Sequence, residues 1–348
     1  TSTSNSDSTS TSNSDSTSTS NSDLISSDHH TTPLPPSSPA HLINPSSPSH
    51  SSSSLSSSYV NMALQHQVLN ALVCLSRVST NKTAIHQAGG TKWLVAILKQ
   101  RKASSAPLSS AAASSSEPAD QQQQQQSEME QRLRESILNK TLECISFLAS
   151  EHTVKQGLHD EGALPLLEDL LKNTLHAQVL VSRTLVHLAL DAKNRALFGE
   201  SGMLQTMMEI INKTQEKTVL LNLLEALQSI LLLGENQRVF CDQGGYPMLF
   251  ALVRVEDNEL RFRCSWLFKI LSVFEENAKH IHQCGMSVFA IELLTMNNDF
   301  VVTQALEILL HQMHNDETRP LIAKYLNETG VLIQLAKATS NQTIHALS

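Results

Sequence analysis

The chain has 348 residues, of which 40% are apolar and 4% aromatic, and 25 Lys and Arg stand against 33 Asp and Glu for a net charge of -8. No run approaches the roughly 18 consecutive apolar residues of a membrane-spanning helix, so we expect no integral membrane segment. Residues 1–58 and 103–130 each hold four acidic residues and no Lys or Arg, so the remainder is neutral. It lacks the net positive field typical of nucleic-acid-binding proteins, and we expect no nucleic-acid partner.

The N-terminal segment 1–58 is rich in serine and opens on an octad, TSTSNSDS, that occurs at 1–8 and again at 9–16. Such a segment buries too little apolar surface to offset its chain entropy, so we predict a disordered tail. No signal peptide is visible in it. The chain begins at Thr1 rather than Met, which suggests a fragment of a longer protein.

A second segment of biased composition, 103–130, passes from an Ala/Ser tract into six glutamines at 121–126. We interpret it as a disordered insert within the region that starts at Tyr59. The sequence therefore predicts a tail at 1–58 and one folded region at 59–348, interrupted by this insert.

The cysteines lie in apolar stretches with helical spacing and form no C-x-x-C pair: Cys74, Cys144, Cys241, Cys264 and Cys284. This pattern favours small buried apolar residues over a disulfide framework. It also favours a reducing compartment, the cytoplasm or the nucleus.

From Tyr59 onward the chain repeats itself. The pattern N-x-x-x-[I/F]-x-x-x-G occurs four times, ending at Gly89, Gly202, Gly244 and Gly285, and half-matches end at Gly162 and Gly330. Successive glycines are 73, 40, 42, 41 and 45 positions apart, and removal of the 28 residues of 103–130 brings the first interval to 45. The period is therefore about 42 residues, which is typical of a solenoid.

Each repeat predicts three helices. A short helix ends at the glycine, where a left-handed turn is expected, and a second short apolar helix follows. A longer third helix carries apolar residues ten, nine and six positions before the next repeat's Asn; the first of these helices is expected at 61–79. The predicted core residues are Ala71, Leu72, Leu75, Cys144, Ile145, Leu148, Thr184, Leu185, Leu188, Ala226, Leu227, Ile230, Leu267, Phe268, Leu271, Ala305, Leu306 and Leu309.

One repeat cannot bury its own apolar stripe, so about six repeats must stack into an all-α solenoid. The N-x-x-x-[I/F]-x-x-x-G junctions and the A-L-x-x-L stretches over residues 59–340 resemble the armadillo repeat family. The resemblance implies a right-handed superhelix whose third helices line a concave groove. In members such as importin-α and β-catenin, that groove binds extended peptides.

The groove of this chain departs from the importin-like pattern W-x-x-x-N. The six Asn positions, seven residues before each junction, hold Cys74, Phe147, His187, Ser229, Ile270 and Ile308. The Trp positions hold Asn70, Glu143, Arg183, Glu225, Trp266 and Gln304, so only Trp266 matches. A groove without the asparagine row must recognise its ligand by side-chain contacts. The candidate binding residues are Trp266, Arg263, Lys269, Arg183, His187 and Glu225.

Catalytic and cofactor motifs are absent from the sequence. There is no phosphate-binding G-x-x-x-x-G-K-[ST], and Asp and Glu are scattered singly. His280, His282 and Cys284 form H-x-H-x-C, in which His280 and Cys284 share one helical face. Two ligands do not make a zinc site, which normally needs at least three protein ligands. We expect neither an enzyme nor a metal or cofactor.

The primary hypothesis is a non-enzymatic scaffold that binds a protein or peptide on the concave face. Two alternatives stay open: the regulatory or targeting segment of a larger enzyme or cytoskeletal regulator, and an armadillo-type chaperone cofactor. Both rest on the family resemblance, and the missing Met and the incomplete last repeat also motivate the first.

Overall fold

The computed structural model describes residues 57–104, 118–296, 298–334 and 336–337. The chain divides into two units, Thr1–Ser53 and Ser54–Ser348, and every described residue belongs to the second. The predicted tail lies outside the described residues up to position 56. Its last two positions, 57 and 58, are helical instead.

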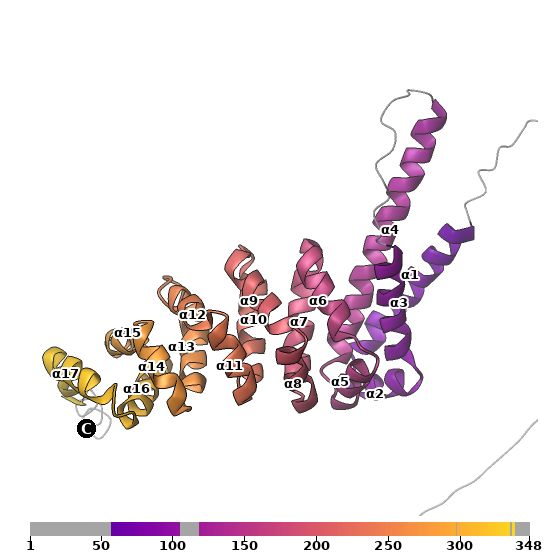
Figure 1. Ribbon diagram of the computed structural model, residues 1–348. Coiled ribbons are helices and arrows are strands. Elements are labelled where there is room, and N and C mark those ends of the chain that lie inside the picture. The colour runs from indigo at the N-terminus through magenta and orange to yellow at the C-terminus, as the bar shows by residue number, and fades with distance from the viewer. Residues whose placement is uncertain (1–56, 105–117, 297, 335, 338–348) are drawn as a thin grey trace, which may run out of the picture. The chain divides into compact units, whose positions relative to one another are not determined.

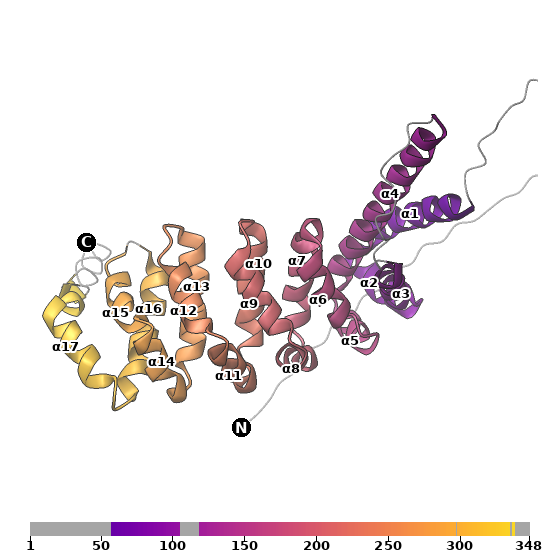
Figure 2. The ribbon, with the colours of Figure 1, turned by 45° about the horizontal axis from the view of Figure 1, so that its top comes forward.

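Every regular element in the described ranges is helical, and the helices recur in sets of three (Figures 1 and 2). The first helices are α2 (Ser79–Gln87), α5 (His152–Asp160), α8 (Ala192–Glu200), α11 (Gly234–Asp242), α14 (Ala278–Gln283) and α17 (Arg319–Thr329). The second helices are α3 (Gly90–Ser104), α6 (Leu164–Asn173), α9 (Met203–Lys213), α12 (Gly245–Val253) and α15 (Met286–Leu293). The third helices are α1 (Ser57–Ser76), α4 (Pro118–Leu148), α7 (Gln178–Ala189), α10 (Lys217–Ile230), α13 (Asn258–Ser272) and α16 (Asp299–His314). Short 3₁₀ turns, η1 (Leu175–Ala177) and η2 (Glu275–Asn277), precede α7 and α14.

Neighbouring repeats stack through like helices. The third helices pack on one another in the order α1, α4, α7, α10, α13 and α16, and the first helices do so from α2 through α11. The six junction glycines all have positive φ, between 60° and 91°, which confirms the predicted left-handed turns. These observations establish the predicted α-solenoid.

The predicted core is confirmed in five of the six third helices, with Leu306 packed against the core rather than fully inside it. It is wrong in α1, where Ala71 and Leu75 are exposed and Leu69, Val73 and Ser76 are buried instead. No described helix precedes α1, so the positions that would face a first and second helix have nothing to pack on. The side of α1 that contacts α4 becomes its buried side.

The predicted insert is also corrected. Positions 103 and 104 end α3, and α4 begins at Pro118, so the glutamine run at 121–126 is helical; 105–117 lies outside the described residues. Gln, Glu and Arg are strong helix formers, and ion pairs one turn apart join Glu128 to Arg132 and Glu130 to Arg134. The N-terminal half of α4 extends beyond α7 (Figure 1).

The cysteines partly match the prediction. Cys144 and Cys264 are buried, and this burial raises the pKa of each thiol to about 12. Cys241 and Cys284 are half-buried, and Cys74 is exposed, which corrects the prediction for that residue. Cys74 is exposed for the same reason as Ala71, since it lies on the uncovered side of α1.

The junction asparagines hold successive repeats together. Asn81, Asn236 and Asn277 each donate a hydrogen bond from Nδ2 to the carbonyl six residues earlier, at the end of the preceding third helix. Asn236 also donates to the Arg195 carbonyl of the previous first helix at 2.8 Å. A buried side-chain amide thereby satisfies carbonyls that a helix end leaves open.

The buried stripe of α10 gives a direct test of the fold. Leu227 is fully buried, whereas Leu232, two residues beyond the end of α10, is 57% exposed. We expect Leu227→Asp to abolish cooperative thermal unfolding of the neighbouring repeats, because an unpaired buried carboxylate costs several kcal/mol. The matched Leu232→Asp should stay within about 0.5 kcal/mol of the unsubstituted chain. Equal unfolding curves for the two variants would contradict this core.

Candidate functional site

The candidate site lies on the side of the third helices that faces away from the core. In α13 the buried residues Leu260, Cys264, Leu267, Phe268 and Leu271 face the core, while half-buried side chains follow one another on the opposite side at helical spacing. We call this surface the third-helix face. Its central residues are Val179, Arg183, His187, Leu221, Glu225, Phe262, Arg263, Trp266, Lys269, Phe300 and Glu307.

Ion pairs connect neighbouring third helices across this face. Arg263 of α13 lies 3.0 Å from the Glu225 carboxylate of α10. Lys269 of α13 lies 2.5 Å from the Glu307 carboxylate of α16. The structure thus brings four of these charges into two pairs, which join three consecutive repeats. Three of the predicted site residues are among them: Glu225, Arg263 and Lys269.

An aromatic cluster lies between these pairs. The ring of Trp266 is 6.0 Å from that of Phe262, and Phe262 meets Phe300 of α16 edge-on at 6.3 Å. The ammonium group of Lys269 lies 5.1 Å from the centre of the Trp266 ring. Phe300 is 70% exposed, and Trp266 and Phe262 are half-buried. Trp266 therefore packs against neighbours and still presents part of its surface to solvent.

Arg183 and His187 lie one turn apart on α7, as predicted. Arg183 is exposed and His187 is half-buried. Burial lowers the pKa of His187, and the positive charges of Lys155, Lys82 and Arg183 lower it further, against the opposite effect of Glu225. The structure therefore surrounds His187 mainly with cations.

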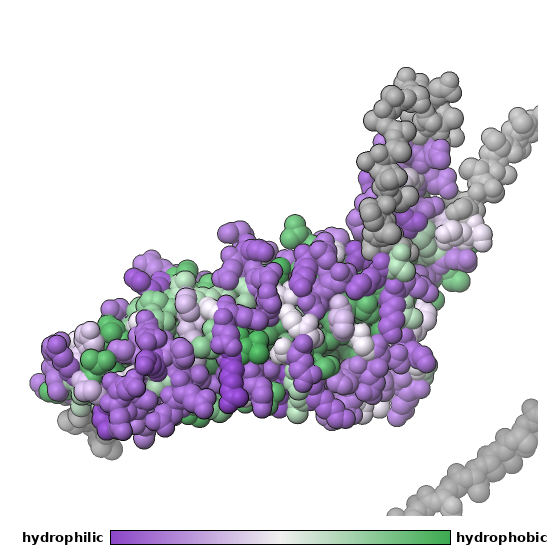
Figure 3. All heavy atoms as spheres, viewed as in Figure 1, coloured by the Kyte–Doolittle hydropathy of each residue, from purple (hydrophilic) through white to green (hydrophobic). Residues whose placement is uncertain are grey.

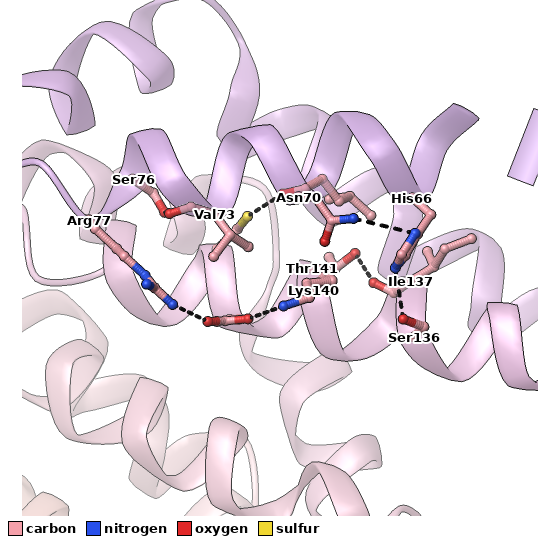
Figure 4. Close-up of polar contacts among 12 residues, drawn as sticks. His66, Asn70, Val73, Ser76, Arg77, Ser136, Ile137, Lys140 and Thr141 are labelled. Carbon is pink, nitrogen blue, oxygen red and sulfur yellow. Dashed lines mark hydrogen bonds and ion pairs between the residues drawn. The ribbon is translucent and has the colours of Figure 1, made fainter. Parts of the chain in front are cut away.

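The N-terminal end of the face is held by polar contacts between α1 and α4 (Figure 4). Glu143 accepts from Arg77 at 3.0 Å and from Lys140 at 2.9 Å, and these contacts lower its pKa although its partial burial opposes them. Nearby, the His66 ring lies 2.8 Å from the Ser136 hydroxyl. The cations beside Glu143 are thus already paired.

Sequence reasoning missed Phe262, Phe300 and Glu307. Phe262 and Phe300 occupy equivalent positions, each four residues before one of the Trp positions of the importin-like pattern, Trp266 and Gln304. Helical spacing could therefore have indicated both. The pairing of Glu307 with Lys269 had no such signal, because it depends on how far α16 is shifted along α13.

Open clefts occur away from the aromatic cluster. One of about 780 Å³ lies between the η1–α7 and α9–α10 connections and is lined by Leu175, Val179, Lys213 and Thr214, among others. In the described ranges no three His, Cys, Asp or Glu residues are grouped closely enough to hold a metal ion. His280 stacks on Tyr246 at 5.8 Å between ring centres. No described helix is long and apolar enough to cross a membrane.

The chain matches no protein-family model and no curated protein. It does match solved structures. The designed armadillo repeat protein YIII(Dq)4CqI aligns with a TM-score of 0.57 at 15% identity, over 72% of this chain and 98% of that one. A second designed armadillo repeat protein, in complex with the peptide (KR)4, gives 0.57 at 16% over the same shares. An engineered protein gives 0.59 at 18%, over 75% and 94%.

The chain has an armadillo fold. The agreement with designed armadillo proteins extends over nearly their whole length. At this level of identity it establishes the arrangement of the helices, as the family resemblance of the junctions predicted.

The lowered pKa of His187 predicts a pH dependence of stability. In the unfolded chain this residue binds a proton near pH 6.5, whereas in the folded chain it does so only at lower pH. The contribution of the neutral His187 to folding stability is therefore complete above pH 6.5 and is lost as the pH falls below it. We expect His187→Gln to lose less stability than the unsubstituted chain between pH 7.5 and pH 5.5, measured by urea unfolding. His176→Gln, which removes an exposed histidine on η1, is the matched control. Identical slopes for the two variants would contradict this assignment.

Proposed function

We propose that the chain is a non-enzymatic protein-interaction scaffold that binds an extended protein segment along the third-helix face, the concave face of armadillo arrays. The observation that carries the proposal is the partly exposed aromatic cluster of Phe262, Trp266 and Phe300. Aromatic side chains contribute a disproportionate share of the energy at protein interfaces. The peptide complex of a designed protein with the same fold supports this use of the architecture.

The solenoid surface is mostly polar, and the charges beside the cluster are paired. In the view of Figure 3, hydrophilic residues cover most of the solenoid, and hydrophobic residues form separate patches between them. Around Trp266 the charges of Arg263 and Lys269 are already neutralised by Glu225 and Glu307. An apolar anchor framed by paired charges is typical of a binding surface with a polar rim.

The two alternatives, a regulatory segment of a larger enzyme or cytoskeletal regulator and a chaperone cofactor, stay predictions of the family resemblance. We found no contact among the described residues that favours either. A cytoplasmic or nuclear location likewise stays a prediction.

Peptide selection tests the proposal. Random twelve-residue peptides displayed on phage should yield binders to the full chain, and Trp266→Ala should weaken selected synthetic peptides at least tenfold, since loss of an interface anchor costs about 2 kcal/mol. Phe274→Ala removes a partly exposed aromatic ring beyond the end of α13 and should leave the affinity unchanged.

The measurement is fluorescence anisotropy, with circular dichroism and thermal unfolding to confirm that each variant folds. Selection of no peptide above background, or equal affinities for Trp266→Ala and the unsubstituted chain, would contradict binding at this face.

A further inference from the structure

Arg183 differs from the other cations of the third helices. Seven further Lys and Arg residues are described on these helices, and each has a partner: Arg132, Arg134, Lys140, Lys217, Arg261, Arg263 and Lys269. Among the described residues Arg183 makes no ion pair and no hydrogen bond, and its side chain is exposed. One guanidinium group on the face is thus available to a ligand.

Positive charges dominate the electrostatic surroundings of His187, one turn from Arg183 on α7. Lys155 of α5 is 91% buried and forms no ion pair among the described residues, and together with Lys82 it acts on His187 in the same direction as Arg183. The acids at the equivalent positions of the two neighbouring third helices already have partners: Glu143 of α4 pairs with Arg77 and Lys140, and Glu225 of α10 pairs with Arg263 at 3.0 Å. An anionic group is the ligand that complements this part of the face.

The aromatic cluster offers the opposite chemistry. Phe262, Trp266 and Phe300 present ring surface, and the nearest cation, Lys269, is neutralised by Glu307. A large apolar or aromatic side chain would bury ring surface there without separating a charge from its partner.

The distance between the two features sets a spacing in the ligand. Arg183 and Trp266 hold equivalent positions, each eleven residues before a junction asparagine, and α7 and α13 are separated by α10 alone. Two helix-to-helix steps amount to about 20 Å. An extended chain covers this distance in roughly six residues at about 3.3 Å each.

We propose that the third-helix face selects an extended segment of another protein that carries an Asp or Glu at Arg183 and an aromatic or large aliphatic side chain at Trp266, five to seven residues apart. This inference rests on the proposed function and gives it a ligand class. It predicts the reverse charge preference from the basic peptide (KR)4 bound by the designed armadillo protein.

The chain's own N-terminal segment is a poorer ligand. Residues 1–56 contain four Asp and no Phe, Trp or Tyr. Asp28 and Leu34 are six positions apart, so the segment meets the spacing only with an aliphatic anchor in place of an aromatic one. We therefore assign the face to a partner, and competition by a synthetic peptide of residues 21–40 checks that choice.

The peptides selected against the full chain test the inference. We expect an acidic residue five to seven positions from a large apolar one, and Arg183→Glu should weaken the selected synthetic peptide roughly tenfold. The same variant should regain affinity for a peptide in which Lys replaces the acidic residue. The matched Arg238→Glu, at an exposed position on α11, should change neither affinity.

The outcomes separate the inference from the proposed function. If selected peptides depend on Trp266 but lack the acidic residue, or are unaffected by Arg183→Glu, the ligand class is wrong and the scaffold function stands. If no peptide depends on Trp266, both are wrong. Phosphoserine that binds tenfold tighter than Glu in the selected peptide would overturn the carboxylate assignment, and displacement by the peptide of residues 21–40 would overturn the choice of a partner.

Discussion

The structure depends on one constraint: the apolar stripe of each third helix is buried only when neighbouring helices cover it. Leu185, Leu227 and Leu267 are fully buried because the helices of their own repeat and the adjacent third helices enclose them. Helix α1 shows the consequence when part of that cover is missing, since Leu75 is half exposed. The stability of such an array depends on the interfaces between neighbouring repeats, because each repeat buries the apolar surface of the next.

Hydrogen bonds of the junction asparagines fix how the helices of successive repeats are placed relative to one another, which apolar burial alone does not specify. The amide of Asn236 joins the end of α10 to α8, and Asn277 joins the end of α13 to Gln237 of α11 at 2.7 Å. Gly199 belongs to the same arrangement, because a Cβ at this position would collide with the Asn236 side chain. The junction asparagine Asn277 thus has a structural role at the C-terminal end of α13, apart from the aromatic cluster.

The same geometry determines which charges remain for a ligand. Stacking places Arg263 beside Glu225 and Lys269 beside Glu307, so these four side chains stabilise the array modestly and neutralise one another. Arg183 makes no ion pair among the described residues. The charges that this face leaves unpaired therefore follow from the packing of neighbouring helices, and a list of charged residues on the third helices does not reveal them.

The sequence by itself determined the repeat, its period, the left-handed glycine turns and most of the core, because these features depend on residues close together in the chain. It also indicated Trp266 from its register. It misjudged α1 and the glutamine run, since low complexity hid good helix formers and no local signal shows that a neighbour is missing. Only the tertiary structure decided that Phe300 joins Trp266 through Phe262, that Arg263 is paired and that Arg183 is not. Those outcomes depend on contacts between helices about 40 residues apart, whose relative shift and rotation no short sequence pattern encodes.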